Sequence, residues 1–507
     1  MQSRSGSGVA STPRAAAAAT NSATTPTSAA VAQISVPPNL SAVFHQAVYT
    51  PLHAVVQAWI LSEVGRQVDD FINGAAGSYV IGNGVAGTED HRNGGAAGWL
   101  GNHGAVGTSG AAAVATQPTG PLRPLTNTGT WLTTSDGQVV IVHGLNEVYK
   151  VAPYEPSASG FDEADAQFLQ DNGFNVVRLG VIWAGVEPNS GEINTAYLDS
   201  IQQTVDMLAD HGIYTIIDLH QDLYSSEFYG EGAPDWASDG GGRSNKNSGF
   251  PGNYYVNSAM NHAWDAIRSV DGITALYLEP PNPAVTEVPT LLGLPVALLG
   301  RIGDPNFVLA FHDYCGPIGG ALCTKIANTL AAQPRSYSKR HNVPAVMNEF
   351  GATSEASTLT KEMSAGDRYL MGWAEWAYTG EGDMTGSPDV KGLVYDPALL
   401  PVGDNVNAGN VAILSSPYPQ IVSGTPSAWS FKNGTLDFSY STAKVHGSGT
   451  FDQGSLSTFS VPQVQYPNGY QVTVTGGRVV SASNAAQLVI ASDQGATTIS
   501  VVVSPAT

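Results

Sequence analysis

The residue best suited to direct chemistry is Glu349, which ends the apolar run VPAVMNEFG (343–351) and is followed at once by a glycine. A parallel barrel places functional carboxylates in this way, at the carboxyl end of a buried strand. An ionised carboxylate there can attack an electrophilic carbon or accept a proton. Polar or aromatic residues close the other apolar runs of the same region: Asn146, Arg178, His220 with Asp222, Glu279, His312 with Tyr314, and Trp376.

Together these residue types are the equipment of glycoside hydrolysis with retention. A carboxylate attacks the sugar carbon, cationic and hydrogen-bonding neighbours keep it ionised, and an aromatic ring stacks on the apolar face of the sugar. Each residue alone also has a structural explanation, such as a salt bridge for Arg178 or core packing for Trp376. Because all of them stand at successive strand ends, the sequence favours an active site.

Seven near-continuous apolar runs are expected to form buried parallel strands, since both faces of such a sheet are covered. They are 138–146, 174–181, 214–222, 274–280, 307–314, 344–351 and 372–378. Helical segments alternate with them; in 194–212 the predicted apolar stripe is Leu198, Ile201, Val205 and Leu208. This alternation predicts an α/β fold, a (β/α)8-type TIM barrel over residues 121–415, with seven strands where eight are required.

The two ends of the chain differ from this central region in composition and in the pattern of apolar residues. Residues 416–507 alternate apolar and polar positions between glycine-containing turns, which predicts an antiparallel β-sandwich. Residues 1–33 are rich in Ala, Ser, Thr and Pro and are expected to be disordered, whereas 34–73 has a helical apolar period. Residues 74–120 are Gly- and Asn-rich and resemble the repeats of mycobacterial cell-envelope proteins; a plain linker fits them equally well.

The charge balance excludes several classes of partner. The chain has 42 acidic and 21 basic residues, a formal net charge of −21. Nucleic acids and anionic membranes both attract basic surfaces, so neither is expected to bind, and a neutral substrate is favoured. No apolar run is long enough to span a bilayer, and the N-terminus lacks the hydrophobic core of a signal peptide.

The two cysteines, Cys315 and Cys323, are close enough in sequence to form a small disulfide loop, although two buried thiols fit equally well. A metal site made from them is not expected, because no suitably spaced Cys or His partners accompany them.

Several motifs resemble the endoglycoceramidase group of glycoside hydrolase family 5. They are HGLNEVYKVAPYEP (143–156), GFNVVRLGVIWAGVEPNSG (173–191), DLHQDLYS (218–225), GEGAPDW (230–236), FVLAFHDYC (307–315), VPAVMNEFG (343–351), GWAEWAY (372–378) and SPYPQIVSGTP (416–426). The resemblance covers about residues 121–507. It implies a barrel with a C-terminal β-domain and retaining hydrolysis of the bond between sugar and lipid. No cofactor or metal is expected. The composition, with few charged residues, and the Gly-rich N-terminal region favour secretion or a cell-envelope location.

The resemblance also implies roles for individual residues. Glu349 matches the nucleophile. Four residues match those that surround and orient it: Arg178, His220, His312 and Tyr314. Three more match sugar contacts: Lys150, Asp222 and Trp376. The substrate implied is a neutral glycolipid or oligosaccharide.

One part of the family pattern is missing. The acid/base glutamate of the family lies in an Asn-Glu-Pro motif at the end of strand 4, and no such motif occurs in this chain. Residues 253–265 run directly into 266–272, which resembles the end of the helix that follows strand 4. A unit containing strand 4 is therefore expected to be absent, leaving strands 3 and 5 as open edges of the barrel.

Glu279 is the nearest substitute for the missing acid, and Glu231, Asp235 and Glu375 are weaker ones. If none of them donates a proton, a non-catalytic glycolipid-binding protein of the cell envelope is the alternative to an impaired enzyme. A poorly folded product is a third reading.

Overall fold

The computed structural model describes residues 122, 124–222, 224–228, 230–238, 268, 274–279, 304, 306–314, 320–383, 392–445, 447 and 449–506. The expected disordered segment 1–33, helix 34–73 and Gly/Asn-rich segment 74–120 lie outside these residues, as does Cys315. The chain divides into two compact units at Ala111/Ala112, and every described residue belongs to the second.

The centre of this unit is a parallel sheet of seven strands in the order β6-β5-β4-β10-β9-β8-β7. The strands are β4 (His143–Glu147), β5 (Val176–Ile182), β6 (Tyr214–His220), β7 (Leu276–Leu278), β8 (Phe307–Asp313), β9 (Ala345–Phe350) and β10 (Gly372–Glu375). This is the strand order of a (β/α)8 barrel with one strand removed, so the predicted barrel fold is confirmed, with seven strands among the described residues. Over the described residues the sheet curls as a half-barrel and does not close.

The two edges of the sheet are the strands on either side of the missing one. Within the described residues, β6 pairs only with β5 and β7 pairs only with β8. On the outward face of β6, Ile217 is 51% exposed and Leu219 is 61% exposed. The apolar side chains remain where a buried strand would need them, but no described helix covers this part of the face.

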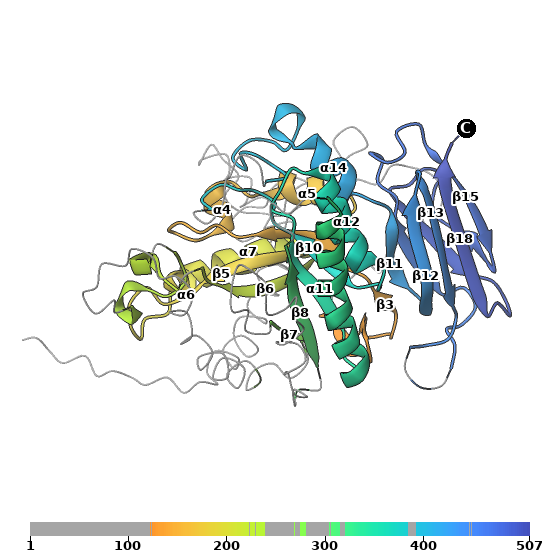
Figure 1. Cartoon of the computed structure of the whole chain (residues 1–507), viewed down its shortest axis with the longest axis horizontal. Coiled ribbons are helices and arrows are strands. Elements are labelled where there is room, and N and C mark those ends of the chain that lie inside the picture. The colour runs from red at the N-terminus through yellow and green to blue at the C-terminus, as the bar shows by residue number, and fades with distance from the viewer. Residues whose placement is uncertain are drawn as a thin grey trace, which may run out of the picture. The chain divides into compact units, whose positions relative to one another are not determined.

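Helices cover the remainder of the sheet. The longer ones are α5 (Glu163–Asp171), α7 (Thr195–Asp210), α11 (Gly320–His341) and α12 (Ala356–Asp367), and α4 (Pro156–Ser159), α6 (Trp183–Val186) and α14 (Ala408–Leu414) are short. Figure 1 shows α11 and α12 along the outside of the sheet, where they pack on β8, β9 and β10. Single-turn 3-10 helices lie at Ser226–Phe228, Asp235–Ala237 and Gly403–Asn405.

The stripe predicted for the helix at 194–212 is only partly right. Ile201 and Leu208 are buried, whereas Leu198 is 39% exposed and Val205 is partly buried. The fully buried positions of α7 are Tyr197, Ile201, Thr204 and Leu208. This series follows the helical repeat more closely, and it turns the Tyr197 hydroxyl toward the backbone N–H of Ile182, which donates to it at 3.0 Å.

Antiparallel strands form the predicted C-terminal sandwich. One sheet has the order β12-β13-β18-β15, with β12 (Thr425–Lys432), β13 (Thr435–Ser441), β15 (Tyr470–Thr475) and β18 (Thr498–Pro505). The facing sheet contains β11 (Tyr418–Val422), β14 (Leu456–Ser460), β16 (Gly477–Val479) and β17 (Gln487–Ser492). It also takes in β1 (Thr126–Thr128), β2 (Trp131–Thr133) and β3 (Val139–Val140), which precede the barrel in the chain.

Aromatic stacking joins the barrel to this sandwich. The buried His143 ring, at the start of β4, lies 4.0 Å from the ring of Trp373 and 3.7 Å from that of Tyr418. Burial lowers the pKa of His143 well below its usual value, so the ring is neutral and suited to stacking. The Tyr418 hydroxyl donates to the carbonyl oxygen of Gly173 at 2.9 Å, which ties β11 to the turn before β5.

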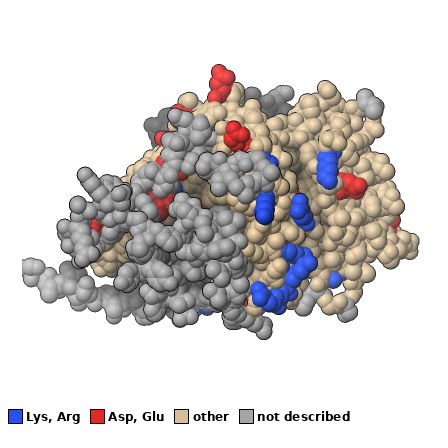
Figure 2. Space-filling view, viewed as in Figure 1, with Lys and Arg blue, Asp and Glu red and all other residues tan. Residues whose placement is uncertain are grey.

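Figure 2 shows a face on which most of the described side chains are uncharged, as expected for a chain with 12% charged residues. Cys323 in α11 is disulfide-bonded. Among the described helices, none combines the length and apolarity needed to cross a membrane.

Candidate active site

Glu349 lies at the carboxyl end of β9 and is brought opposite His312 of β8 by an irregularity in the strand pairing between Phe311 and His312. Gly351 follows with a φ of 87°, a left-handed conformation that favours glycine. A Cβ at this position would also come within 3 Å of Glu375 and Leu359. The glycine noted in the sequence therefore lets the chain turn away directly after the carboxylate.

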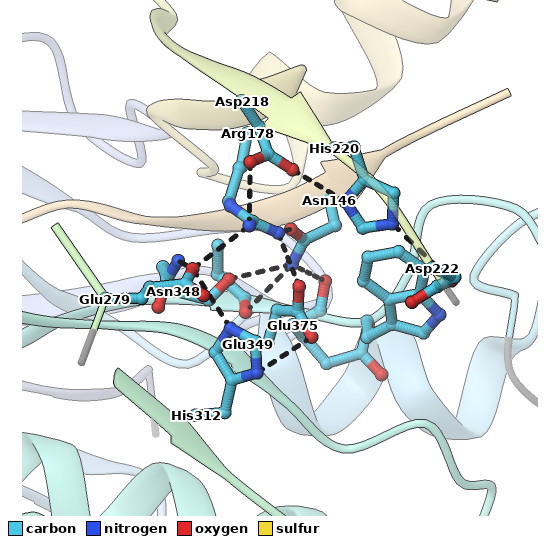
Figure 3. A network of polar contacts seen from close by, with 12 residues as sticks. Asn146, Arg178, Asp218, His220, Asp222, Glu279, His312, Asn348, Glu349 and Glu375 are labelled. Carbon is cyan, nitrogen blue, oxygen red and sulfur yellow. Dashed lines mark hydrogen bonds and ion pairs between the residues drawn. The ribbon is translucent and has the colours of Figure 1, made fainter. Parts of the chain in front are cut away.

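Three donors converge on the Glu349 carboxylate, as Figure 3 shows for two of them. Arg178 Nη1 lies 2.6 Å from Oε1, and the Tyr314 hydroxyl donates to Oε2 at 3.0 Å. His312 Nδ1 lies 3.3 Å from Oε2. Burial and the charge of Glu349 raise the pKa of Tyr314 well above its usual value, so the phenol stays a donor. The arrangement holds a buried carboxylate ready to act as a nucleophile.

Arg178 organises the neighbouring carboxylates as well. Nη2 lies 2.9 Å from Asp218 Oδ1 and 3.1 Å from Glu279 Oε1, and Nη1 donates to Asn146 Oδ1 at 2.9 Å. The Asn146 amide in turn donates to the carbonyl oxygens of Asn348, Ala374 and Glu375. The guanidinium is thus fixed from strands on both sides of β4, and its planar fork suits this multiple recognition.

Glu279 accepts hydrogen bonds or ion pairs from three groups. Besides Arg178, the amide of Asn348 donates to it, and His312 Nε2 lies 3.0 Å from its Oε1. Burial raises the pKa of Glu279, but His312 and then Arg178 outweigh this and hold the pKa well below its usual value. Glu279 does reach the site, as the sequence suggested, yet a carboxyl held in its ionised form is a poor proton donor.

His312 bridges the two carboxylates. Burial lowers the pKa of its imidazole, but Glu279 and Glu349 outweigh the burial and raise the pKa to about 9. The ring is therefore a cation at neutral pH. The protonated imidazole pairs with Glu279 and Glu349 at the same time.

The predicted sugar contacts lie together beside this network. Lys150 Nζ lies 2.5 Å from Asp222 Oδ2 and 3.0 Å from Asp383 Oδ1, and 4.4 Å from the centre of the Trp376 ring. Trp376 Nε1 donates to Asp383 Oδ2 at 3.2 Å. Burial lowers the pKa of Lys150, but Asp222 and Asp383 outweigh it and raise the pKa, so the ammonium is charged.

His220 connects the two halves of the site. Its Nδ1 lies 2.7 Å from Asp218 Oδ2, its Nε2 lies 3.7 Å from Asp222 Oδ2, and its ring stacks on Trp376 with centres 5.3 Å apart. Burial lowers its pKa, but Asp218 and Asp222 raise it to about 10.

Glu231 is a buried carboxyl of this cluster whose pKa lies near neutrality. It is 3% exposed, and burial, then Asp222, raise its pKa to about 7. Its Oε1 lies 3.7 Å from His220 Nε2, and neither of its oxygens has a hydrogen-bond partner among the described residues. Glu231 therefore adjoins the sugar-contact residues through His220, not the Glu349 carboxylate.

The other weak substitutes lie elsewhere. Asp235 is exposed in a 3-10 turn, where it accepts from the Ser226 hydroxyl at 2.9 Å. Glu375 is fully buried against Gly351 and Glu362, and burial raises its pKa well above its usual value. The alternation that placed Glu375 away from Trp376 accounts for this position.

His220, Asp222 and Glu231 offer ligand atoms within 4.8 Å of one another, a spacing compatible with a metal ion. Two cations, Lys150 and His220, already pair with these carboxylates. The ammonium of Lys150 contacts Asp222, and a protonated His220 has no lone pair to offer a metal. The residues therefore fit a charge-paired network better than a metal site.

Three contributors were missed in the sequence: Asp218, Asn348 and Asp383. Asp218 had a usable signal, because it lies two residues before His220 and strand alternation puts both on one face. The side-chain amide of Asn348 donates a hydrogen bond to Glu279, although Asn348 directly precedes Glu349 in β9. Asp383 follows β10 in an irregular segment, where no period predicts side-chain direction.

Comparison with known proteins shows what this chain is similar to. Residues 135–250 match the model described as cellulase (glycosyl hydrolase family 5), and residues 417–503 match that of the glycoside hydrolase family 5 C-terminal domain. An endoglycoceramidase I of Rhodococcus hoagii is 26% identical over 74% of this chain and 87% of its own length. An endoglycoceramidase of Cyanea nozakii is 39% identical over 29% of this chain and 32% of its own length.

The fold agrees with these matches. The solved endo-glycoceramidase II from Rhodococcus sp., in complex with a five-membered iminocyclitol, superposes with a TM-score of 0.59 and 22% identity. The alignment covers 74% of this chain and the whole of that one. The strand-end carboxylate held by Arg, Tyr and His lies between two segments that match domains of glycoside hydrolase family 5, and the chain resembles the endoglycoceramidases of that family.

Proposed function

We propose that this protein is a retaining β-glycosidase that cleaves the bond between sugar and lipid in glycolipids, with Glu349 as nucleophile. The observation that carries the proposal is the convergence of Arg178, Tyr314 and His312 on the Glu349 carboxylate. The names of the relatives support the substrate class, since they are described as endoglycoceramidases, and one related solved structure is a complex with ganglioside GM3.

The proposed reaction follows from the three groups that hold the Glu349 carboxylate in place. One Glu349 oxygen attacks the anomeric carbon, the bond to the lipid oxygen breaks, and a covalent glycosyl-enzyme forms, which water then hydrolyses. The transition state carries positive charge on the sugar ring. A site in which carboxylates outnumber cations stabilises that charge.

The sugar contacts are proposed for Lys150, Asp222 and Trp376. Lys150 and Asp222 offer a donor and an acceptor to sugar hydroxyls, and Asp222 remains about a third exposed, with a side-chain exposure of 31%. The Trp376 ring is 7% exposed and is fixed by Asp383, His220 and Lys150, so its proposed sugar contact is confined to the exposed part of the ring.

Hydrolysis of dinitrophenyl β-glycosides tests the nucleophile, because a leaving group of this kind departs without a proton donor. We expect Glu349→Gln to lose at least about 10³-fold in kcat, as removal of a nucleophile does. Glu163→Gln, which changes an exposed carboxyl of α5, is the control. Equal rates for wild type and Glu349→Gln contradict the proposal.

A non-catalytic glycolipid-binding protein is the second candidate, favoured by the ionised state of Glu279. In that case the same residues bind the sugar and no bond breaks. Calorimetry with glucosylceramide distinguishes the two, since saturable binding without product after prolonged incubation supports the binding protein. Turnover at an ordinary enzymatic rate rejects it.

We also propose a secreted or cell-envelope location. Cys323 is disulfide-bonded, and disulfides persist mainly in oxidising compartments outside the cytosol. Fractionation of cells that express the full chain tests this, and recovery in the cytosolic fraction alone contradicts it.

A further inference from the structure

Two buried carboxyl groups meet at the turn that follows the nucleophile. The backbone N–H of Gly351, two residues after Glu349, donates to Glu362 Oε2 at 3.0 Å. A Cβ on the same glycine would lie 2.8 Å from Glu375 Oε1. Glu362 belongs to α12 and Glu375 to β10, and both residues are 0% exposed. Carboxyls from two different elements therefore pack against one residue of this turn.

The same turn joins the strand of the nucleophile to the aromatic wall of the site. The Trp376 N–H donates to the carbonyl oxygen of Phe350 at 2.9 Å, and the Ala352 N–H donates to the carbonyl oxygen of Trp376 at 2.9 Å. These two hydrogen bonds form the bridge that pairs Gly351 with Trp376. A displacement of this turn therefore moves Glu349 and Trp376 relative to one another.

Glu375 is also connected to the guanidinium that holds the nucleophile. Its carbonyl oxygen accepts from the side-chain amide of Asn146 at 3.1 Å, and Asn146 Oδ1 accepts from Arg178 Nη1 at 2.9 Å (Figure 3). The backbone of β10 at Glu375 thus helps to place Arg178, which lies 2.6 Å from Glu349.

Electrostatics determines how the two buried carboxyls coexist. Burial penalises each negative charge, and repulsion between two ionised carboxylates adds to this penalty. A single proton on the pair removes one charge and makes the neutral carboxyl a donor toward the ionised one. The hydrogen bond from Gly351 favours the ionised form of Glu362. Burial and then the charge of Glu362 raise the pKa of Glu375 well above its usual value, which agrees with Glu375 as the protonated member.

We infer that Glu375 and Glu362 share one proton and form a positioning pair, which fixes the turn that sets Glu349 against Trp376. The neutral Glu375 ties β10 to Gly351, and the ionised Glu362 ties α12 to it. The kinetic part of this inference rests on the proposed function, because it needs Glu349 as nucleophile. The shared proton is a property of the folded protein.

Two variants of Glu375 separate the shared proton from simple packing. In Glu375→Gln the amide can donate to Glu362, as the neutral carboxyl does, whereas Glu375→Met keeps an unbranched side chain of similar length without a donor. With a dinitrophenyl β-glycoside, we expect kcat of Glu375→Met to lie about 10- to 10²-fold below that of Glu375→Gln, as displacement of catalytic groups predicts. Equal kcat values for the two variants, both folded by their melting transitions, overturn the positioning role.

The matched control makes the same two changes at an exposed position. Glu163 of α5 has a side-chain exposure of 68% and pairs with His211 at 3.4 Å. Glu163→Gln and Glu163→Met are expected to have equal kcat. A gap as large as that at Glu375 overturns the inference, because it shows that the loss of any carboxyl donor or acceptor has the same effect.

The shared proton has a spectroscopic signature that packing alone does not produce. A protonated carboxyl gives an infrared C=O stretch that an ionised carboxylate lacks. The difference spectrum between wild type and Glu375→Gln, in heavy water at neutral pH, isolates the contribution of Glu375. We expect the wild type to show the band and the variant to lose it. A variant that loses only carboxylate bands overturns the inference, and this measurement requires neither turnover nor Glu375→Met.

The outcomes separate this inference from the proposed function. If the wild type hydrolyses dinitrophenyl β-glycosides through Glu349 and the Glu375 band is absent, the inference fails and the proposed function stands. If the folded wild type hydrolyses none of them, the proposed function fails and the positioning role fails with it, whatever the infrared band shows.

Discussion

Arg178 holds Glu349 and Glu279 on a single guanidinium, with Nη1 2.6 Å from Glu349 Oε1 and Nη2 3.1 Å from Glu279 Oε1. His312 joins the same two carboxylates from the other side. The Glu279 carboxyl, which follows β7, therefore belongs to the group of residues that hold the nucleophile. It is not set apart from it as a proton donor.

Replacing Arg178 by lysine is expected to lower kcat on a dinitrophenyl glycoside by about 10²-fold, because one ammonium cannot contact Glu349, Glu279 and Asp218 in the plane of a fork. Steady-state kinetics at saturating substrate measure this change in kcat. Arg478→Lys is the control, since Arg478 pairs with Asp493 on the surface of the sandwich at 3.3 Å. An Arg178→Lys enzyme with wild-type kcat contradicts this role.

Glu279→Gln is expected to lower the pKa of His312 from about 9, because Glu279 is the largest of the charges that raise it. The imidazole resonance of His312, followed by NMR from pH 5 to 10, reports the change. In the wild type the ring should stay protonated through neutral pH. An unchanged midpoint in the variant shows that Glu279 does not hold the cation.

Glu231→Gln is expected to stabilise the protein more at pH 8 than at pH 5. The pKa of Glu231 rises from a usual 4.5 to about 7 in the folded protein. The folded state therefore binds the proton more tightly, so its favourable contribution is present below pH 4.5 and is lost as the pH rises through 7.

The amide introduced by Glu231→Gln does not ionise, so the variant avoids this loss. At about 1.4 kcal/mol per pKa unit the gap between variant and wild type approaches roughly 3 kcal/mol above pH 7. Urea unfolding at the two pH values measures it. A gap that is the same at both values contradicts the assignment.

Lys150→Met is expected to raise KM and to destabilise the protein by about 3 kcal/mol or more, because it removes the ammonium that pairs with both Asp222 and the buried Asp383. Lys432→Met, at an exposed position of β12, is the matched control. Denaturant unfolding and initial rates give the two effects. A Lys150→Met protein as stable as the control argues that the pairs with Asp222 and Asp383 contribute nothing.

Much of the fold could be predicted because its signals are local. Each barrel strand is a continuous apolar run ending in a polar residue, and the missing strand shows as an interrupted alternation between 253–265 and 266–272. The strand order then leaves β6 and β7 as the edges. What the sequence did not reveal was the entry of β1, β2 and β3 into the C-terminal sheet, because pairing across about 280 residues has no local pattern.

The site also has features that the sequence predicted and features that it did not. Glu349, Arg178, His312 and Tyr314 were found from strand ends, and all four contact one another through the Glu349 carboxylate. Whether Glu279 could be an acid depended on three-dimensional contacts with Arg178, His312 and Asn348. A strand-end position gives the location of a carboxyl but not its protonation state, which its neighbours set.

The most direct measurement is covalent trapping with an activated 2-fluoro glycoside, followed by mass spectrometry of the intact protein and of its peptides. The account predicts a mass increase of one glycosyl group, carried by a peptide that contains Glu349 and absent from Glu349→Gln. A properly folded protein that stays unlabelled, or that carries the label on another residue, contradicts it.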